Sequence, residues 1–143
     1  MRKGIGGFTL IEIVITIAII AILLSAIGVG SGVMGNAKVN SAAQSVKQLH
    51  TAAQSYIAAG NMTFTGISAA GLVTSKFLPD GFSATASNPW GGDYTVAVNA
   101  SDSSKVDIAL TSVPADAGTR LSALFKNSAS ATTYVGTTWT ATF

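Results

Sequence analysis

Hydrophobic and polar residues divide this chain of 143 residues into three stretches. Residues 7–27 form an almost unbroken apolar run, interrupted by a single glutamate, Glu12. Residues 36–60 repeat apolar side chains every three or four positions, whereas residues 61–143 combine short alternating segments with turn residues. The repeat every three or four residues in 36–60 is typical of an amphipathic helix, and the alternation in 61–143 is typical of strands. A long helix followed by one small head is therefore expected.

The apolar run is long enough to cross a membrane. Residues 13–37, between Glu12 and Lys38, carry no formal charge. As a helix they would extend roughly 37 Å, which exceeds the ~30 Å hydrocarbon core of a bilayer. Arg2 and Lys3 precede the run, and this positive charge predicts a cytoplasmic N-terminus with the head on the outer side. A cleaved secretory signal peptide is the alternative.

The second stretch, residues 36–60, places apolar and polar side chains on opposite faces of a helix, and Gly60 with Asn61 marks its end. The apolar face is rich in alanine, so an element that packs on it can approach closely. The expected apolar face is formed by Val39, Ala42, Ala43, Val46, Leu49, Ala53, Tyr56 and Ile57. The expected polar face is formed by Lys38, Gln44, Lys47, Gln54 and Ser55.

The first half of the head predicts a short helix and two strands. Residues 68–78 favour a helix that ends at Pro79, because proline and the glycine that follows it favour a turn. Residues 93–98 and 106–110 alternate as strands, and polar turn residues lie between them. These segments indicate a hairpin.

The second half of the head begins after Pro114. The residues expected on one buried helical face are Ala117, Leu121, Leu124 and Phe125. Residues 132–143 alternate as one or two final strands. The expected fold class is thus α+β, with a long N-terminal helix packed against a small antiparallel sheet.

Composition narrows the functional classes. Charged residues make up 10% of the chain and hydrophobic residues 48%, with a mean hydropathy of +0.49, so much of the surface is expected to face lipid or protein. The formal charge of +2 disappears when Arg2 and Lys3 are removed, and no basic stripe remains for nucleic acid. The absence of cysteine excludes disulfides and thiolate metal sites.

The order MRKGIGG, FTLIE and then a long aliphatic run resembles the class III signal of type IV pilins and pseudopilins. The resemblance implies that a membrane prepilin peptidase cleaves after Gly7 and N-methylates Phe8, which leaves 136 residues of the 143 after the seven of the leader are removed. It also implies a leader at 1–7, a transmembrane and filament-core helix at 8–35, an amphipathic helix at 36–60 and a head at 61–143.

Glu12 is the only glutamate of the chain and lies where a carboxylate is costly. An acid in hydrocarbon costs a few kcal/mol and usually has a partner. Within one subunit, the amine that cleavage creates on Phe8 would lie one helical turn from Glu12. The helix N-terminus would also stabilise the Glu12 carboxylate by about 0.3–1 kcal/mol. The resemblance implies a further role, in which Glu12 attracts the Phe8 amine of a neighbouring subunit during assembly.

Four glycines join the two halves of the expected helix: Gly28, Gly30, Gly32 and Gly35. Each costs a helix interior about 1 kcal/mol relative to alanine. One interpretation is close helix packing through small residues. The other, which the resemblance implies, is a segment that loses its helical structure on assembly, although the proline that many relatives have here is absent.

Two head motifs resemble the type IVb group, which includes the thin-pilus pilins of conjugation systems: NPWGG at 88–92 and Val113-Pro114 followed by Leu121. The cysteine that commonly follows the Val-Pro pair in that group is missing here. Trp90 is expected to cover the sheet rather than to contact a ligand.

No catalytic constellation is present, and the chain is not expected to be an enzyme or to hold a metal or cofactor. His50 is the only histidine and is expected on the helix surface. The aspartates at positions 80, 93, 102, 107 and 116 are expected in turns or at element ends, where they bond to the local backbone. They lack EF-hand spacing, and a loop calcium site like that of major pseudopilins is the remaining metal hypothesis. The sequence contains no phosphate-binding loop and no nucleophile elbow.

The resulting functional hypothesis is a structural subunit, the major pilin of an extracellular type IV pilus. Its expected partners are further copies of itself, the prepilin peptidase, the inner membrane and the pilus assembly machinery, and no nucleic acid. The chain would lie in the inner membrane before assembly. The alternative is a pseudopilin of a type II secretion or competence system. A binding module whose head docks a surface or DNA, and an enzyme with a membrane anchor, are the more distant hypotheses.

Overall fold

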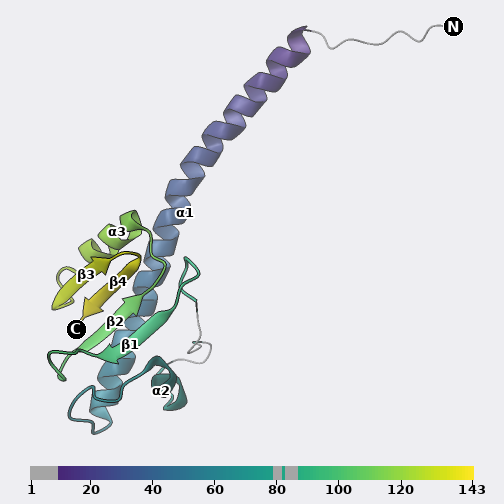
Figure 1. The fold of residues 1–143 in the computed structure, drawn as a ribbon. Coiled ribbons are helices and arrows are strands. Elements are labelled where there is room, and N and C mark those ends of the chain that lie inside the picture. Colours follow the sequence, from purple (N-terminus) through teal and green to yellow (C-terminus); the bar gives the residue numbers. More distant parts are fainter. Residues whose placement is uncertain (1–9, 79–81, 83–86) are drawn as a thin grey trace. The chain divides into compact units, whose positions relative to one another are not determined.

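The computed structural model describes residues 10–78, 82 and 87–143, and it describes the backbone but not the side chains of Leu10, Glu12 and residues 20–33. Three helices and four strands follow one another along the chain (Figure 1). They are α1 (Leu10–Ala58), α2 (Ala69–Thr74), β1 (Tyr94–Val98), β2 (Val106–Leu110), α3 (Ala115–Phe125), β3 (Ala131–Val135) and β4 (Thr138–Thr142). The predicted α+β class is confirmed.

The chain divides into two compact units, Met1–Asn36 and Ala37–Phe143. The first holds the N-terminal part of α1, and the second holds the rest of α1 with every other element. Helix α1 is assigned without interruption across this boundary, which directly follows the glycine-containing segment 28–35. The hydrophobic core described below belongs to the second unit.

The predicted apolar face of α1 is confirmed. Val46 and Leu49 are fully buried, and Tyr56 and Ile57 pack half-buried at its end. The buried residues of this face are Val39, Ala42, Ala43, Val46, Leu49, Ala52 and Ala53. On the predicted polar face the side chains are exposed, apart from Ser55, which is half-buried.

The four strands form one antiparallel sheet in the order β1-β2-β4-β3. The chain places α3 between β2 and β3, and β4 then returns to pair with both strands. Residues 132–143, predicted as one or two strands, form a hairpin whose turn contains Gly136 at φ 63°. The left-handed conformation at this position favours glycine.

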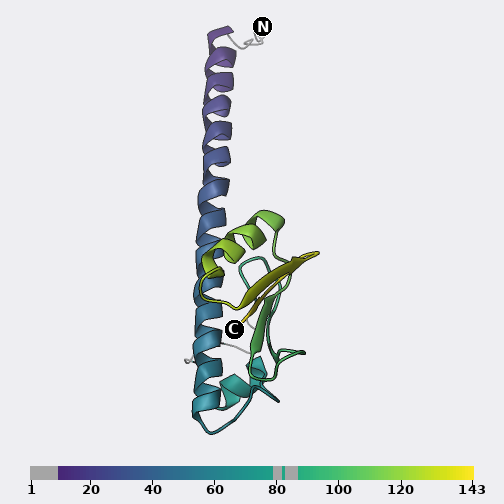
Figure 2. The same ribbon diagram turned by 90° about the vertical axis from the view of Figure 1, so that its left-hand side faces the viewer.

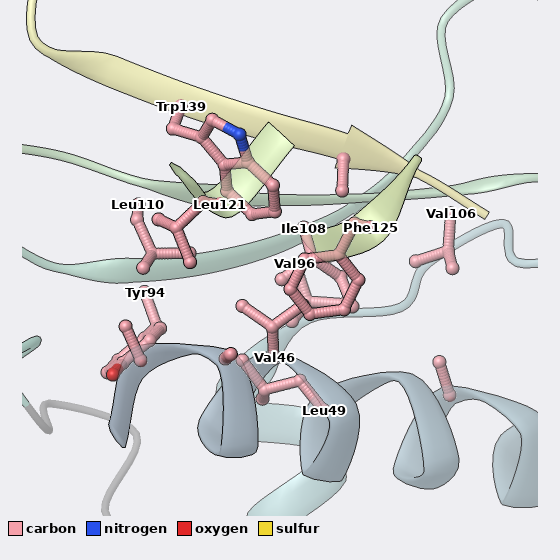
Figure 3. Packing of buried hydrophobic residues seen from close by; sticks show 14 of the residues in the cluster. Val46, Leu49, Tyr94, Val96, Val106, Ile108, Leu110, Leu121, Phe125 and Trp139 are labelled. Atoms are coloured by element: carbon pink, nitrogen blue, oxygen red, sulfur yellow. The ribbon is translucent and has the colours of Figure 1, made fainter. Parts of the chain in front are cut away.

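One face of the sheet is buried against α1 and α3. Alternate residues of the strands point toward the helices, because strand side chains alternate between faces. Figure 3 shows Val46 and Leu49 of α1 directed toward the sheet residues and Phe125. The buried sheet residues are Tyr94, Val96, Val106, Ile108, Leu110, Trp139 and Ala141.

Helix α3 covers the end of the sheet formed by β3 and β4. Trp139 is fully buried, donates through Nε1 to Ser122 Oγ at 3.0 Å, and contacts Phe125 with ring centroids 5.5 Å apart. Ala117, Leu121 and Phe125 are buried as predicted. The prediction for Leu124 was wrong: the side chain is 55% exposed, because α3 turns Gly118 rather than Leu124 toward the sheet.

Helix α2 is shorter than the predicted 68–78. The Oγ atom of Ser68 caps its start by accepting a hydrogen bond from Gly71 N at 3.1 Å. The helix ends at Thr74, and Lys76 at φ 59° lies in the left-handed region, which the helix cannot continue through. The predicted end at Pro79 lies outside the described residues.

Gly118 sets how closely α3 approaches β3. A Cβ added at this position would lie 2.6 Å from Cδ2 of Tyr134, whose hydroxyl donates to Val113 O at 2.8 Å. The ring is therefore held from its far end and cannot move away without breaking a hydrogen bond.

We predict that Gly118→Ala lowers the free energy of unfolding of the head by about 1–3 kcal/mol, because the added methyl group overpacks a close contact. The chain has two tryptophans, Trp90 and Trp139, and both lie in the second unit, so tryptophan fluorescence of the full chain in detergent reports its denaturation. Gly35→Ala is the matched control, since an added Cβ there meets nothing within 4 Å. An equal midpoint for both variants would contradict the close contact.

Candidate processing site and assembly surface

The predicted processing residues Gly7 and Phe8 lie outside the described residues. Glu12 is the third residue of α1, which begins at Leu10, and its side chain is likewise outside the described part. A carboxylate in the first turn of a helix is stabilised by the unpaired backbone N–H groups and the helix dipole, by about 0.3–1 kcal/mol. The backbone position of Glu12 is thus a favourable one for an acid.

The first turns of α1 present exposed apolar side chains over most of their circumference. Six apolar residues, spaced at about 100° per residue, leave one sector of the helix free, and Glu12 and Thr16 lie in that sector. An apolar surface this wide on a helix is normally buried in protein or lipid. Its members are each 51–65% exposed and are Ile11, Ile13, Val14, Ile15, Ile17 and Ile19. This surface is therefore expected to be buried, and no other described part of the same chain buries it.

The glycine segment is helical. Gly28, Gly30, Gly32 and Gly35 all lie within α1, and Gly35 has open space around its α-carbon. The surroundings of the other three lie outside the described side chains, so both interpretations of this segment stay predictions. Within the part of the chain whose placement is described, no helix combines the length and the hydrophobicity that crossing a membrane requires.

The NPWGG motif is organised by its asparagine. Asn88 is 3% exposed, and its Oδ1 accepts from Trp90 N at 3.0 Å and Gly92 N at 3.2 Å. Its Nδ2 donates to Thr111 O at 2.7 Å and to Asp93 O at 3.4 Å. One buried amide thus joins the loop before β1 to the residue that follows β2.

The glycines and the tryptophan of this motif also have structural roles. A Cβ at Gly92 would lie 2.2 Å from Thr111 O, so only glycine permits this approach of two backbones. Gly91 has φ 83°, a conformation that L-residues rarely adopt. Trp90 is half-buried and packs against the core, as predicted for a residue that covers the sheet.

Asp107 corrects the prediction that all aspartates lie in turns or at element ends. It is the second residue of β2, and its carboxylate accepts from Asn99 Nδ2 at 3.0 Å and Thr142 Oγ1 at 2.7 Å. Asp102 is in the β1–β2 turn as predicted: it accepts from the N–H and hydroxyl of Ser104, and these bonds lower its pKa. The carboxylates serve the hairpin, and among the described residues no cluster of three or more potential metal-binding side chains occurs.

His50 also differs from its prediction as a surface residue. The imidazole is half-buried and stacks on Phe143 with ring centroids 4.2 Å apart. Burial lowers its pKa, because the charged form loses hydration. The histidine therefore belongs to the packing between α1 and the chain that follows β4.

A helix α1 that is apolar over most of its circumference at its start, and apolar on one face under a four-stranded antiparallel sheet later, is the architecture of a type IV pilin subunit. Two family models agree with it: the prokaryotic N-terminal methylation motif matches residues 2–28, and the PilS N-terminal model matches residues 31–143. The chain belongs to the PilS family of type IV pilins. The methylation motif implies processing by a prepilin peptidase and assembly into a pilus. No curated protein and no solved structure matches the chain.

Asn88→Ala is predicted to lower the free energy of unfolding of the head by about 2–4 kcal/mol, since several buried hydrogen bonds at about 1 kcal/mol each are lost and their partners stay unsatisfied. Asn61→Ala is the control, because Asn61 is exposed and its side chain donates one hydrogen bond, to Tyr56 O at 2.8 Å. Urea denaturation of the full chain in detergent, followed by tryptophan fluorescence, compares the two. Similar losses for both variants would contradict the role of Asn88.

Proposed function

We propose that this pilin is cleaved between Gly7 and Phe8, N-methylated at Phe8, and polymerised as the major subunit of an extracellular type IV pilus. Before assembly the chain is held in the inner membrane by residues 8–35 with its N-terminus in the cytoplasm. The subunit is structural and performs no catalysis. The energy for polymerisation comes from other components of the assembly machinery.

The exposed apolar surface of residues 11–19 carries this proposal. Full burial of one isoleucine side chain contributes about 1.5–3 kcal/mol, so several exposed isoleucines give a strong tendency to associate. In the membrane, lipid covers this surface. In a filament the same segment of neighbouring subunits covers it, and the apolar surface supports either state without a change of sequence.

Glu12 is proposed to select the filament over the membrane. Its charge is costly in lipid, and the N-methylated amine of Phe8 in an adjacent subunit supplies an opposite charge at low dielectric. The pairing explains why one acid is kept in an apolar run of residues 7–27. It also aligns neighbouring helices, since only one register brings the two charges together.

Residues 28–35 are proposed to loosen when the subunit joins the filament. Four glycines make this part of α1 weak by about 1 kcal/mol each relative to alanine. The open space around Gly35 and the boundary between compact units after Asn36 support a hinge rather than a close packing site.

The first prediction concerns processing and destination. Protein sheared from the surface of producing cells is expected to begin at N-methylated Phe8 and to contain residues 8–143. Intact mass and N-terminal sequencing measure this directly. Mature protein that stays in the inner membrane, with none in the sheared fraction, would instead favour a pseudopilin. An uncleaved Met1 terminus in cells that contain the peptidase would contradict the processing proposal.

The second prediction concerns assembly. Glu12→Ala is expected to leave membrane insertion intact and to reduce the yield of sheared filaments roughly tenfold, the effect of losing about 1.4 kcal/mol per subunit. Glu12→Asp is the matched control, because it keeps the charge and should restore part of the yield. Immunoblots of membrane and sheared fractions quantify both pools. A normal filament yield from Glu12→Ala would exclude the pairing with Phe8.

A further inference from the structure

A groove runs between α1 and the C-terminal end of α3. It has a volume of about 250 Å³ and is lined by Asn40, Ala43, Gln44, Lys47 and Leu124. Figure 2 shows one end of α3 beside α1, in agreement with the groove residues. The groove combines an exposed apolar side chain, Leu124, with an exposed positive charge, Lys47.

The charge of Lys47 has no counterpart within the described part of the subunit. Lys47 forms no ion pair there, and the described side chains of α1 include no acid. The adjacent Leu124 remains 55% exposed although its helix belongs to the core. An apolar side chain beside an unpaired cation fits a partner that is small, apolar and acidic.

The opposite end of α3 has these properties. Its N-terminal end exposes the N-cap residue Pro114 with Ala115 and Asp116, and Asp116 is not paired with any described cation. Asp116 and Leu124 are eight residues apart, which is about 12 Å along a helix. One subunit therefore presents the groove and its complementary segment at two ends of the same helix.

We propose that the groove of one subunit binds residues 114–116, at the N-terminal end of α3, from a second copy, with Lys47 facing Asp116 and Leu124 contacting Pro114 and Ala115. This contact rests on the proposed function, because it joins heads within the pilus. It uses two different patches, so it propagates along a polymer instead of closing as a dimer.

Charge balance supports a contact between identical heads. Removal of Arg2 and Lys3 with the leader leaves six basic residues of the original eight, and all six acidic residues remain. The side chains of the mature chain then sum to zero formal charge. The sixth acid, Glu12, lies in the N-terminal unit, so residues 37–143 carry a formal charge of +1. Net repulsion between neighbouring heads is therefore small, and individual pairs such as Lys47 and Asp116 can decide their orientation.

Crosslinking in the filament tests the contact, since the chain contains no cysteine of its own. The full-length double variant with Lys47→Cys and Asp116→Cys is produced in assembling cells, and sheared filaments are treated with a short bis-maleimide. A ladder of dimers, trimers and larger species on a denaturing gel is expected. Each single variant, and the pair Lys76→Cys with Asp116→Cys, should give no ladder. Filaments without a ladder, or with dimers alone, overturn the proposal.

A charge exchange provides the second test if the cysteine variant yields no filaments. Lys47→Glu is expected to reduce the filament yield roughly fivefold, the upper range for an exposed ion pair, while Lys76→Glu leaves it unchanged. Adding Asp116→Lys to Lys47→Glu should restore the yield to the level of the unmodified chain. A persistent loss in the double variant overturns the contact. Absence of the unmodified chain from the sheared fraction would instead reject the pilus itself.

Discussion

The head depends on the burial of one alanine-rich face of α1 against the sheet. Ala42, Ala43, Ala52 and Ala53 are buried on this face, and Val46 and Leu49 project from it toward residues of β1 and α3 (Figure 3). A two-layer arrangement of this kind buries the apolar side of each element at once. Disturbing the distance between the layers would affect every strand, because all four belong to the same sheet.

The same helix changes its environment along its length. Residues 37–58 have an apolar side covered by the head and a polar side left exposed, whereas residues 11–19 are apolar over most of the circumference, apart from the sector of Glu12 and Thr16. The two parts fall into different compact units, separated just after the glycine segment. This division fits the proposed function, in which lipid or other subunits cover the N-terminal part of α1 while the head has its own core. The distribution of side chains along α1 thus corresponds to the different environments proposed for the two parts of this helix.

Several features of the head could not be derived from local pattern. Nothing in the local pattern of NPWGG marks Asn88 as buried, because its role depends on a hydrogen bond to Thr111, which lies 23 residues further along the chain. Asp107 resembles a turn residue by type, but Asn99 and Thr142 hold it inside a strand. His50 is covered by Phe143, which is distant in sequence. In each case the decisive partner comes from another segment.

The sequence by itself determined the signal motif, the amphipathic face of α1, the position of most strands and the α+β class. These properties follow from the order of neighbouring residues, because periodicity and turn chemistry act over a few positions. Only the tertiary structure decided the strand order β1-β2-β4-β3, the exposure of Leu124 and the close contact of Gly118 with Tyr134. These three features depend on which distant segments pack together. The free energy of that packing depends on both segments and cannot be read from either one alone.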